Sequence, residues 1–444
     1  MTRSAVRLVR NRPTIWVFAA RIRHLLNRSV FFATGAVAAG VVSTPSILSN
    51  VSFLGYSTTA YLAAGLTILI IVTLLVDFTI GVWDSKASLE PEAVARYRAK
   101  NPLLRTAGAT AAGFALFQVT QSTSSLDNPK AIQAVVAYWL LLGATIYLTM
   151  VRRELNPLII TLIWSGAVGA VLIIADSAFS WSIFGGRTSA MYLLLPLALS
   201  LYRVFSPPTQ WALSLGIFSA ISVTASRTAT VTALIIFLTY VLMTRGTRLP
   251  QRILLFASSV ALFSAFLVFN PTVQDRFLDE PGDQAISIEM PFGPANIGLE
   301  GAGTNHHVIN LNTNGRFTVW SALAQKAVLN HPIIGGGSGY SNQFVAEQFG
   351  WNHPHNEFIR IFVDFGAIGS ILFLVALGSL GLFFIRHLKR EREPAFLGIV
   401  ALISVALFSV TEGPLISLGF VLPFSIVVSV AIRGLVVPIE KGRS

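Results

Sequence analysis

Two histidines stand directly in front of a long apolar stretch of this sequence. The segment HPHNE contains His353, His355, Asn356 and Glu357, and the apolar stretch follows at once. A histidine changes its protonation state near neutral pH, so one at such a boundary is suited to take a proton from a reacting hydroxyl group. Two alternatives stay open: a turn that hydrogen-bonds the chain around it, or a metal site. The spacing is not that of HExxH, and no Cys or Asp cluster accompanies it.

Three arginines stand beside apolar runs in otherwise polar surroundings. Arg187 follows two glycines in FGGRTSA, Arg227 lies between two apolar runs in SASRTATVT, and Arg316 lies in NGRFTVW. The planar guanidinium group forms paired hydrogen bonds with phosphate oxygens, so together they predict a site for an anionic group at the level of the lipid headgroups. The alternatives are structural. Arg227 can be a helix-end arginine that reaches towards water, and Arg187 can belong to a turn before a helix.

Other charged residues carry weaker indications. Arg360 and Asp364 are four residues apart, so they face each other on a helix and predict a structural ion pair. Asp77 lies inside an apolar run, where a carboxylate can couple to protons, and Glu412 lies at a corner where it can contact a sugar. The sequence has no P-loop, no Ser-His-Asp order and no DxD-like motif. Chemistry with a cytosolic nucleotide donor is therefore unsupported.

The elements that carry these residues are those of a membrane protein. Of 444 residues, 53% are hydrophobic and 12% charged, and the mean hydropathy is +0.67, whereas soluble domains have roughly a quarter charged residues. The net charge of +12 must be interpreted by its distribution across the bilayer, and no nucleic-acid partner is expected. The absence of cysteine excludes disulfides, thiolate metal sites and a cysteine nucleophile. The composition predicts an all-α polytopic integral membrane protein.

Twelve apolar runs are long enough to cross a bilayer as helices. They lie near residues 29–48, 57–82, 104–121, 131–150, 157–176, 188–202, 209–225, 228–243, 253–269, 358–385, 395–411 and 415–435. With a cytoplasmic N-terminus, 25 of the 32 lysines and arginines fall on the inner side and 7 on the outer side. Without the short run 188–202 the numbers become 19 and 13. Inner loops are enriched in Lys and Arg, so twelve spans with both termini cytoplasmic are predicted.

This topology divides the chain into five segments. They are a basic N-terminal segment at 1–28, transmembrane helices 1–9 within 29–269, a large extracytoplasmic loop at 270–357, helices 10–12 within 358–435, and a cytoplasmic tail at 436–444. Apolar residues interleave with arginines at helical spacing in the first segment. That pattern favours a helix on an anionic membrane surface. The alternative is a basic tail that only fixes orientation.

The large loop contains one predicted helix. Its apolar positions recur at helical spacing and are Phe317, Trp320, Leu323, Ala324, Ala327 and Val328. They predict an amphipathic helix along the outer interface, which ends at Asn330-His331-Pro332. The stretch 279–304 is rich in Gly, Pro and acidic residues and predicts a mobile flap.

The chain resembles the core signature of the O-antigen ligase and polymerase family in two segments, NGRFTVWSALAQKAVLNHPIIGGGSGYS and WNHPHNEFIRIFVDFGAIGSILFL. The signature falls here on Gly315, Arg316, Trp320, Pro332, Gly335, Gly337, His355, Asn356, Gly366 and Gly369. The segments GGRTSAMYLLLPLAL and SRTATVTAL are similar to other outer-face patches of that family. The specific match covers about 80 residues, and the layout of spans and loop extends it loosely over most of the chain.

The resemblance implies a membrane glycosyltransferase with a GT-C-like fold. Such an enzyme takes a glycan from a polyprenyl diphosphate, such as undecaprenyl diphosphate, and moves it to a hydroxyl group of a glycan, lipid or cell-wall acceptor. The reaction would take place on the extracytoplasmic face of a bacterial inner or plasma membrane, with inversion at the anomeric carbon. By the same resemblance it needs no cofactor and no metal. The lipid bilayer would be its permanent partner.

The resemblance also implies roles for particular residues. His355 becomes the general base, and Arg227 and Arg316 become the clamps on the diphosphate, whose negative charge grows as the bond breaks. At the position of Arg187, members of the family more often carry a small polar residue. Arg187 can bind either the glycan donor or the acceptor.

Three neighbours of the base complete the set that the resemblance implies. His353 can share the role of base, and Asn356 and Glu357 support the acceptor side. The sequence does not separate a ligase, which hands a polymer to a separate acceptor, from a polymerase, which joins lipid-linked units. The alternative of another class is a lipid-linked glycan flippase or other polytopic transporter. It would need charges along a path through the bilayer.

Overall fold

The computed structural model describes ten stretches of the chain. They are residues 52–53, 56–57, 101–122, 129–150, 155–179, 186–202, 205–245, 247–278, 316–350 and 353–436. Several predicted features lie outside them: the N-terminal segment 1–28, the run 29–48, the run 57–82 apart from its first residue, and the flap 279–304. Of the tail 436–444, only Val436 is described.

The described residues are almost entirely helical. Two antiparallel strands of two residues each, β1 (Ser52–Phe53) and β2 (Tyr56–Ser57), precede the described helices. The helices are α7 (Pro102–Ser122), α8 (Pro129–Met150), α9 (Asn156–Phe179), α10 (Gly186–Ser200), α11 (Pro207–Val223), α12 (Arg227–Met243), α13 (Leu249–Phe269), α14 (Pro271–Leu278), α15 (Arg316–Asn330), α16 (Tyr340–Phe349), α17 (Glu357–His387), α18 (Arg392–Thr411) and α19 (Leu418–Val436). A 3-10 turn, η1 (Pro414–Ile416), connects α18 to α19.

Every apolar run predicted from residue 104 onward coincides with a helix, α7 to α13 and then α17 to α19. Within the described part of the chain, five helical segments are long and apolar enough to cross a membrane: Leu158–Phe179, Leu249–Phe269, Glu357–His387, Arg392–Thr411 and Gly419–Val436. Ala131–Ile146, Thr188–Ser200 and Arg227–Met243 are shorter apolar helices. The architecture is that of a polytopic helical membrane protein, and the number of twelve crossings stays a prediction.

The predicted loop helix is present as α15, and it ends at Asn330 as expected. The apolar residues of α15 differ in burial. Leu323 and Ala327 are buried, in a small cluster that also includes Val363 of α17, whereas Val328 remains 48% exposed. The helix therefore packs on the bundle with only part of its apolar surface.

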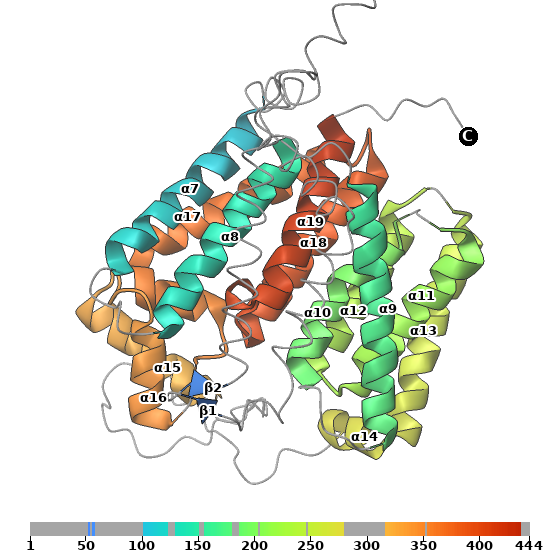
Figure 1. Ribbon diagram of the computed structural model, residues 1–444, viewed down its shortest axis with the longest axis horizontal. Coiled ribbons are helices and arrows are strands. Elements are labelled where there is room, and N and C mark those ends of the chain that lie inside the picture. The colour runs from blue at the N-terminus through green and yellow to red at the C-terminus, as the bar shows by residue number, and fades with distance from the viewer. Residues whose placement is uncertain are drawn as a thin grey trace, which may run out of the picture.

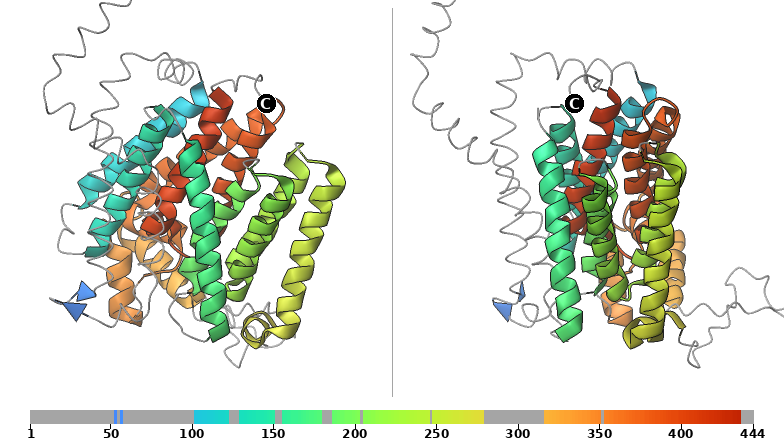
Figure 2. Two further views of the ribbon diagram at one scale, coloured as in Figure 1. Left: turned by 45° about the vertical axis from the view of Figure 1, so that its right-hand side comes forward. Right: turned by 90° about the vertical axis from the view of Figure 1, so that its right-hand side faces the viewer.

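The long helices form a bundle that α14, α15 and α16 close at one end. Figure 1 shows α7, α8 and α17 on one side, α18 and α19 in the middle, and α9 to α13 on the other side. α9 packs against α10 and α11, and α13 packs against α11 and α12. Figure 2 shows α14 across the foot of α13. α17 packs along α7, and α19 packs against α8 and α18. α10 and α12 contact α18 from one side, and α17 contacts it from the other, so α18 connects the two sides of the bundle.

Burial differs strongly between these helices. All residues from Ala190 to Leu201 of α10 and its end are buried, and 83% of the apolar window of α19 is buried inside the protein. In α13 only 11% of that window is buried, so most of its apolar surface faces outward. A soluble monomer rarely exposes an apolar surface of this extent. The arrangement fits a bundle whose outer helices face lipid.

The turn between α15 and α16 is docked on a kink in α17. Four backbone hydrogen bonds of 2.9 to 3.1 Å connect residues 332–337 to residues 363–368. The kink lies at Gly366, where φ is 61° and ψ is −162°. Gly335 has φ +79°, and a Cβ atom there would lie 2.3 Å from the backbone carbonyl of Asp364. Side chains at these two glycines would push the turn and the helix apart, which explains the glycines of the PIIGGG and GAIG segments.

Two glycine substitutions distinguish the cost of the close backbone contact from the cost of the left-handed backbone conformation. Gly350 also has a left-handed backbone, with φ +67°, but its side faces open space. We expect Gly350→Ala to cost about 1 kcal/mol, because an L-residue is disfavoured in that conformation. Gly335→Ala should cost at least about 2 kcal/mol more, since it adds a clash with backbone. Thermal unfolding of the purified protein measures both, and equal midpoints would contradict the docking.

Candidate active site

The polar ends of several helices meet at the end of the bundle that lies lowest in Figure 1. The amide of Ser338 donates to the carbonyl of Gln121 at the end of α7, at 3.4 Å. Gln133, near the start of α8, donates to the carbonyl of Ile416 in η1 at 3.1 Å. The turn before α16 therefore lies against the end of α7, and the start of α8 lies against η1, which follows α18. Residues predicted to be extracytoplasmic thus lie at one end of the molecule.

The turn that carries His355 is held from two directions. The indole N–H of Trp320 in α15 donates to the carbonyl of Pro354 at 2.7 Å. Asn356 caps α17 by accepting the amide of Ile359 at 3.0 Å, and its side-chain amide donates to the carbonyl of Val410 in α18, also at 3.0 Å. His355 itself has a left-handed backbone, with φ 52°. Such values are uncommon outside glycine and concentrate at functional sites.

Glu412 joins His355 to Arg316. Its Oε2 lies 2.8 Å from Nδ1 of His355, and its Oε1 lies 3.3 Å from a guanidinium nitrogen of Arg316. Arg316 also donates to the carbonyl of Thr411, at 2.9 Å. The exposed fraction of the side chain is 24% for His355, 15% for Glu412 and 14% for Arg316. The carboxylate is therefore shared between a base and a cation in a half-buried position, where electrostatic interactions are stronger than in water.

The pKa of Glu412 is lowered from the ordinary value. Burial alone would raise this pKa, but the hydrogen bond and charge of His355 and the charge of Arg316 together outweigh the burial. The carboxylate is thus ionised at neutral pH and can only accept hydrogen bonds. Nδ1 of His355 faces this carboxylate, so the neutral form of the ring would carry its hydrogen on Nδ1 and its lone pair on Nε2. That tautomer suits a general base.

His353 lies against His355. The centroids of the two imidazole rings are 3.8 Å apart, with an angle of 50° between the rings, and Nδ1 of His353 accepts the backbone N–H of His355 at 3.3 Å. One ligand atom each of His353, His355 and Glu412 lies within 4.8 Å of the others. The sequence spacing alone did not show this group, because Glu412 comes from the far end of α18.

The other two predicted arginines begin helices near the same end. The hydroxyl of Thr411 donates to that of Thr228 at 3.0 Å, so the start of α12, where Arg227 is exposed, lies beside the residue that precedes Glu412. The first residue of α10, Gly186, packs against the carbonyl of Thr224, just before α12. The chain at Arg187 therefore lies close to the start of α12.

A buried ionic cluster lies directly behind the site. Arg360 contacts Asp364 at 3.5 Å, which confirms the predicted ion pair, and it also pairs with Glu357 and donates to the hydroxyl of Tyr138 at 2.6 Å. Asp364 accepts the amide of Ser341 at 2.7 Å. Glu357 is fully buried and also accepts the Tyr138 hydroxyl. It supports the site from within the bundle, since these contacts connect α8, α16 and α17.

Sequence reasoning gave Glu412 a different role and did not single out Tyr138. Glu412 was expected to contact a sugar, whereas the structure places it between His355 and Arg316. The sequence feature that indicates a site residue here is the position of Glu412 before Gly413, at a corner between two apolar runs. Tyr138 lies within an apolar helix with no local sign of its role, because its partners are more than two hundred residues away.

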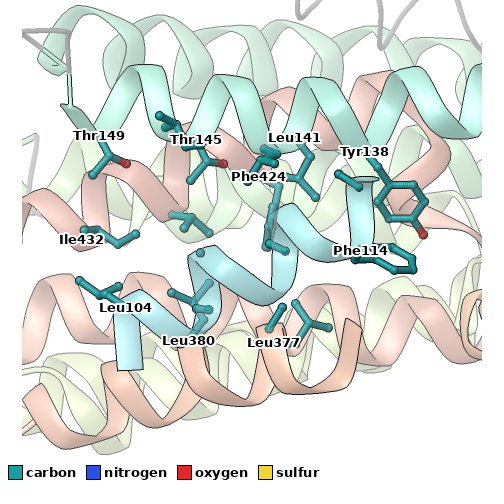
Figure 3. Close-up of a pocket in the computed structure, with 18 of the residues that line it drawn as sticks. Leu104, Phe114, Tyr138, Leu141, Thr145, Thr149, Leu377, Leu380, Phe424 and Ile432 are labelled. Atoms are coloured by element: carbon teal, nitrogen blue, oxygen red, sulfur yellow. The ribbon is translucent and has the colours of Figure 1, made fainter. Parts of the chain in front are cut away.

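An apolar cavity of about 180 Å³ lies between α7, α8, α17 and α19. Figure 3 shows leucines and other apolar side chains from these helices pointing into it, with Thr145 and Thr149 on α8 and Tyr138 at one end. Among the described residues, no carboxylate, histidine, lysine or arginine lines it. The cavity is therefore poorly suited to bind an anion, and the polar cluster around His355 is the candidate active site.

Comparison with known proteins gives one family match. Residues 212–374 match the sequence profile of the O-antigen ligase family. This segment includes α12 and the site residues from Arg227 to Asp364, whereas Glu412 follows it. No curated protein matches the sequence.

The fold and the match together define the class of protein. The exposed apolar helices are those of a membrane protein, and its matched segment indicates a glycosyltransferase-like role. The resemblance to the O-antigen ligase and polymerase family is thus confirmed for residues 212–374, the segment that matches the profile of the O-antigen ligase family.

The ionised Glu412 should make stability depend on pH. Because its pKa is lower when folded, its contribution is fully present above about pH 4.3, the usual value of the unfolded side chain. The contribution is lost as the pH falls through the folded pKa. We expect Glu412→Gln to destabilise the protein by about 1 to 3 kcal/mol at pH 7. That difference should shrink below pH 4.

Thermal unfolding of both proteins across this pH range measures the effect. Glu347→Gln is the matched control, because Glu347 is exposed and accepts a hydrogen bond from Gln343 on its own helix. Its effect should stay below about 0.5 kcal/mol. A Glu412→Gln difference that grows towards acid would contradict the lowered pKa.

Proposed function

We propose that this protein is a metal-independent, inverting membrane glycosyltransferase. It transfers a glycan from a polyprenyl-diphosphate donor to an acceptor hydroxyl group on the extracytoplasmic face of a bacterial inner or plasma membrane. The observation that carries the proposal is the contact between Nδ1 of His355 and the ionised Glu412, at 2.8 Å, within a matched O-antigen ligase domain. It supports a base oriented by a carboxylate, the arrangement that hydroxyl activation needs.

In this proposal Nε2 of His355 accepts the proton of the acceptor hydroxyl. The hydroxyl oxygen attacks the anomeric carbon of the donor, the bond from that carbon to the diphosphate breaks, and the diphosphate leaves with the electron pair. Glu412 stabilises the imidazolium that forms, since a carboxylate favours a neighbouring cation. Attack opposite to the leaving group gives inversion at the anomeric carbon.

The arginines stabilise the departing diphosphate. Arg227, exposed at the start of α12, and Arg316 are the proposed clamps, and Arg187 is an additional donor ligand. Arg316 has a second role, because its contact with Glu412 also fixes the carboxylate that orients His355. Guanidinium groups aimed at charge that develops in the transition state are a common source of rate enhancement.

His353 and Asn356 are supporting residues in this scheme. Asn356 fixes the start of α17 and connects it to α18, and the ring of His353 lies against the ring of His355. A ligase would need a separate lipid, glycan or cell-wall acceptor, whereas a polymerase would use a second donor molecule. The same diphosphate site serves both reactions.

A lipid-linked glycan flippase remains the alternative. A flippase would require polar groups along a path through the bundle. Within the described helices the charged site lies at one end, and the cavity between α7, α8, α17 and α19 has an apolar lining. This distribution favours chemistry at one membrane face over transport.

Removal of the base should abolish transfer. Asparagine tolerates a left-handed backbone better than most residues, so His355→Asn removes the base with little strain. We expect turnover to fall at least about 100-fold. The protein is reconstituted in lipid vesicles with a labelled polyprenyl-diphosphate oligosaccharide as sole glycan. Products spaced by one repeat unit indicate a polymerase, and a product that forms only with an added acceptor indicates a ligase.

His331→Ala is the matched control for this assay, because His331 lies near the same end but is exposed and contacts only the ring of Tyr340 among the aromatic groups. Its turnover should stay close to that of the unmodified protein. Turnover retained in His355→Asn would refute the role of His355. Vesicle-dependent movement of the donor in both variants, without a glycosidic product, would favour the flippase.

Loss of either proposed clamp should weaken use of the donor. We expect Arg227→Ala and Arg316→Ala to lower kcat/KM about 100-fold, in line with the loss of one group that stabilises a developing charge. Arg390→Ala is the control, because Arg390 is exposed after the end of α17, far along the chain from its start. Equal effects of all three substitutions would place the diphosphate elsewhere.

A further inference from the structure

A set of metal-binding side chains converges at the candidate active site. Among the described residues, His353, His355 and Glu412 form a group whose ligand atoms lie within 4.8 Å of one another. The two histidines come from one turn and the glutamate from the end of α18. All three side chains are partly exposed, so an ion can reach them from the surface.

These atoms suit zinc better than the hard cations. Imidazole nitrogen and carboxylate oxygen are ligands that Zn²⁺ prefers, at about 2.0 to 2.2 Å, and three protein ligands with a fourth position open to water form a familiar zinc arrangement. Tetrahedral coordination at these lengths places ligand atoms about 3.3 Å apart. The 2.8 Å contact between His355 and Glu412 would need to open by about half an ångström, which small side-chain rotations provide.

The surroundings hold the ligands but also weaken the site. Arg316 binds the other oxygen of Glu412, and the backbone N–H of His355 donates to Nδ1 of His353, so hydrogen bonds from groups that are not ligand atoms orient both side chains. The positive charge of Arg316 opposes a second cation nearby. The balance favours reversible binding of added zinc over a permanently held ion.

We propose that His353, His355 and Glu412 form an inhibitory Zn²⁺ site. Solvent removes the hydrogen from Nδ1 of His355 and delivers one to Nε2, and zinc binds the lone pair that this change of tautomer frees on Nδ1. The ring stays neutral with its hydrogen on Nε2, so Nε2 can no longer accept the proton of an acceptor hydroxyl. The inhibition rests on the proposed function of His355, whereas the binding does not.

Binding is tested with Co²⁺ as a spectroscopic probe for Zn²⁺. The full-length protein, stripped with chelator, is titrated with Co²⁺, and a site with nitrogen and oxygen ligands in low coordination gives a visible absorption that Zn²⁺ then displaces. We expect His353→Ala to weaken both titrations at least about 10-fold, as losing a ligand should exceed the effect of losing an outer-shell partner. The control is again His331→Ala, which should bind as the unmodified protein does. Equal binding in all three proteins would overturn the site.

Activity in vesicles then tests the inhibition. Zinc should lower transfer by the unmodified protein, chelator should restore it, and chelator alone should not inhibit. The zinc concentration for half inhibition should match that for displacement of Co²⁺. Zinc that binds without lowering transfer would overturn the inhibition. A protein without transfer activity but with saturable, His353-dependent Co²⁺ binding would refute the proposed function and leave the zinc site standing.

Discussion

The carboxylate of Glu412 is the interaction on which the site depends. One of its oxygens contacts His355 and the other contacts Arg316, so a single side chain fixes the base and a cation relative to each other. The three residues come from three separate segments, the start of α15, the turn before α17 and the end of α18. Their relation is therefore only as rigid as the packing of these segments, and much of the local structure serves that packing.

Two kinds of contact provide the rigidity. Backbone atoms of the glycine turn bond directly to the kink of α17, and the cluster of Tyr138, Glu357, Arg360 and Asp364 fastens the same helix to α8 and α16. A buried ionic cluster is not in itself a strong source of stability, since desolvation offsets its attraction. Its directional hydrogen bonds instead restrict how α17 can rotate, and the turn with His355 lies immediately before this helix.

Local patterns predicted much of this arrangement. Apolar runs located the long helices from residue 104 onward, helical spacing located α15, and the four-residue interval located the Arg360–Asp364 pair. Contacts between distant segments were not predictable in this way. No periodic pattern connects Glu412 with His355, or Tyr138 with Arg360, because those contacts depend on how the helices cross. The split of α15 into a buried and an exposed apolar part has the same origin.

The burial of α10 has a consequence for how the protein is made. This helix is short, contains Pro196 and contacts α9, α11, α12, α18 and α19. Two of these partners are synthesised more than 180 residues after α10. Its final environment is absent until α18 and α19 have been synthesised, so assembly around α10 must be completed after translation of α19. A chain truncated before α18 would leave α10 without its last two partners. Such a chain would be a substrate for quality-control proteases.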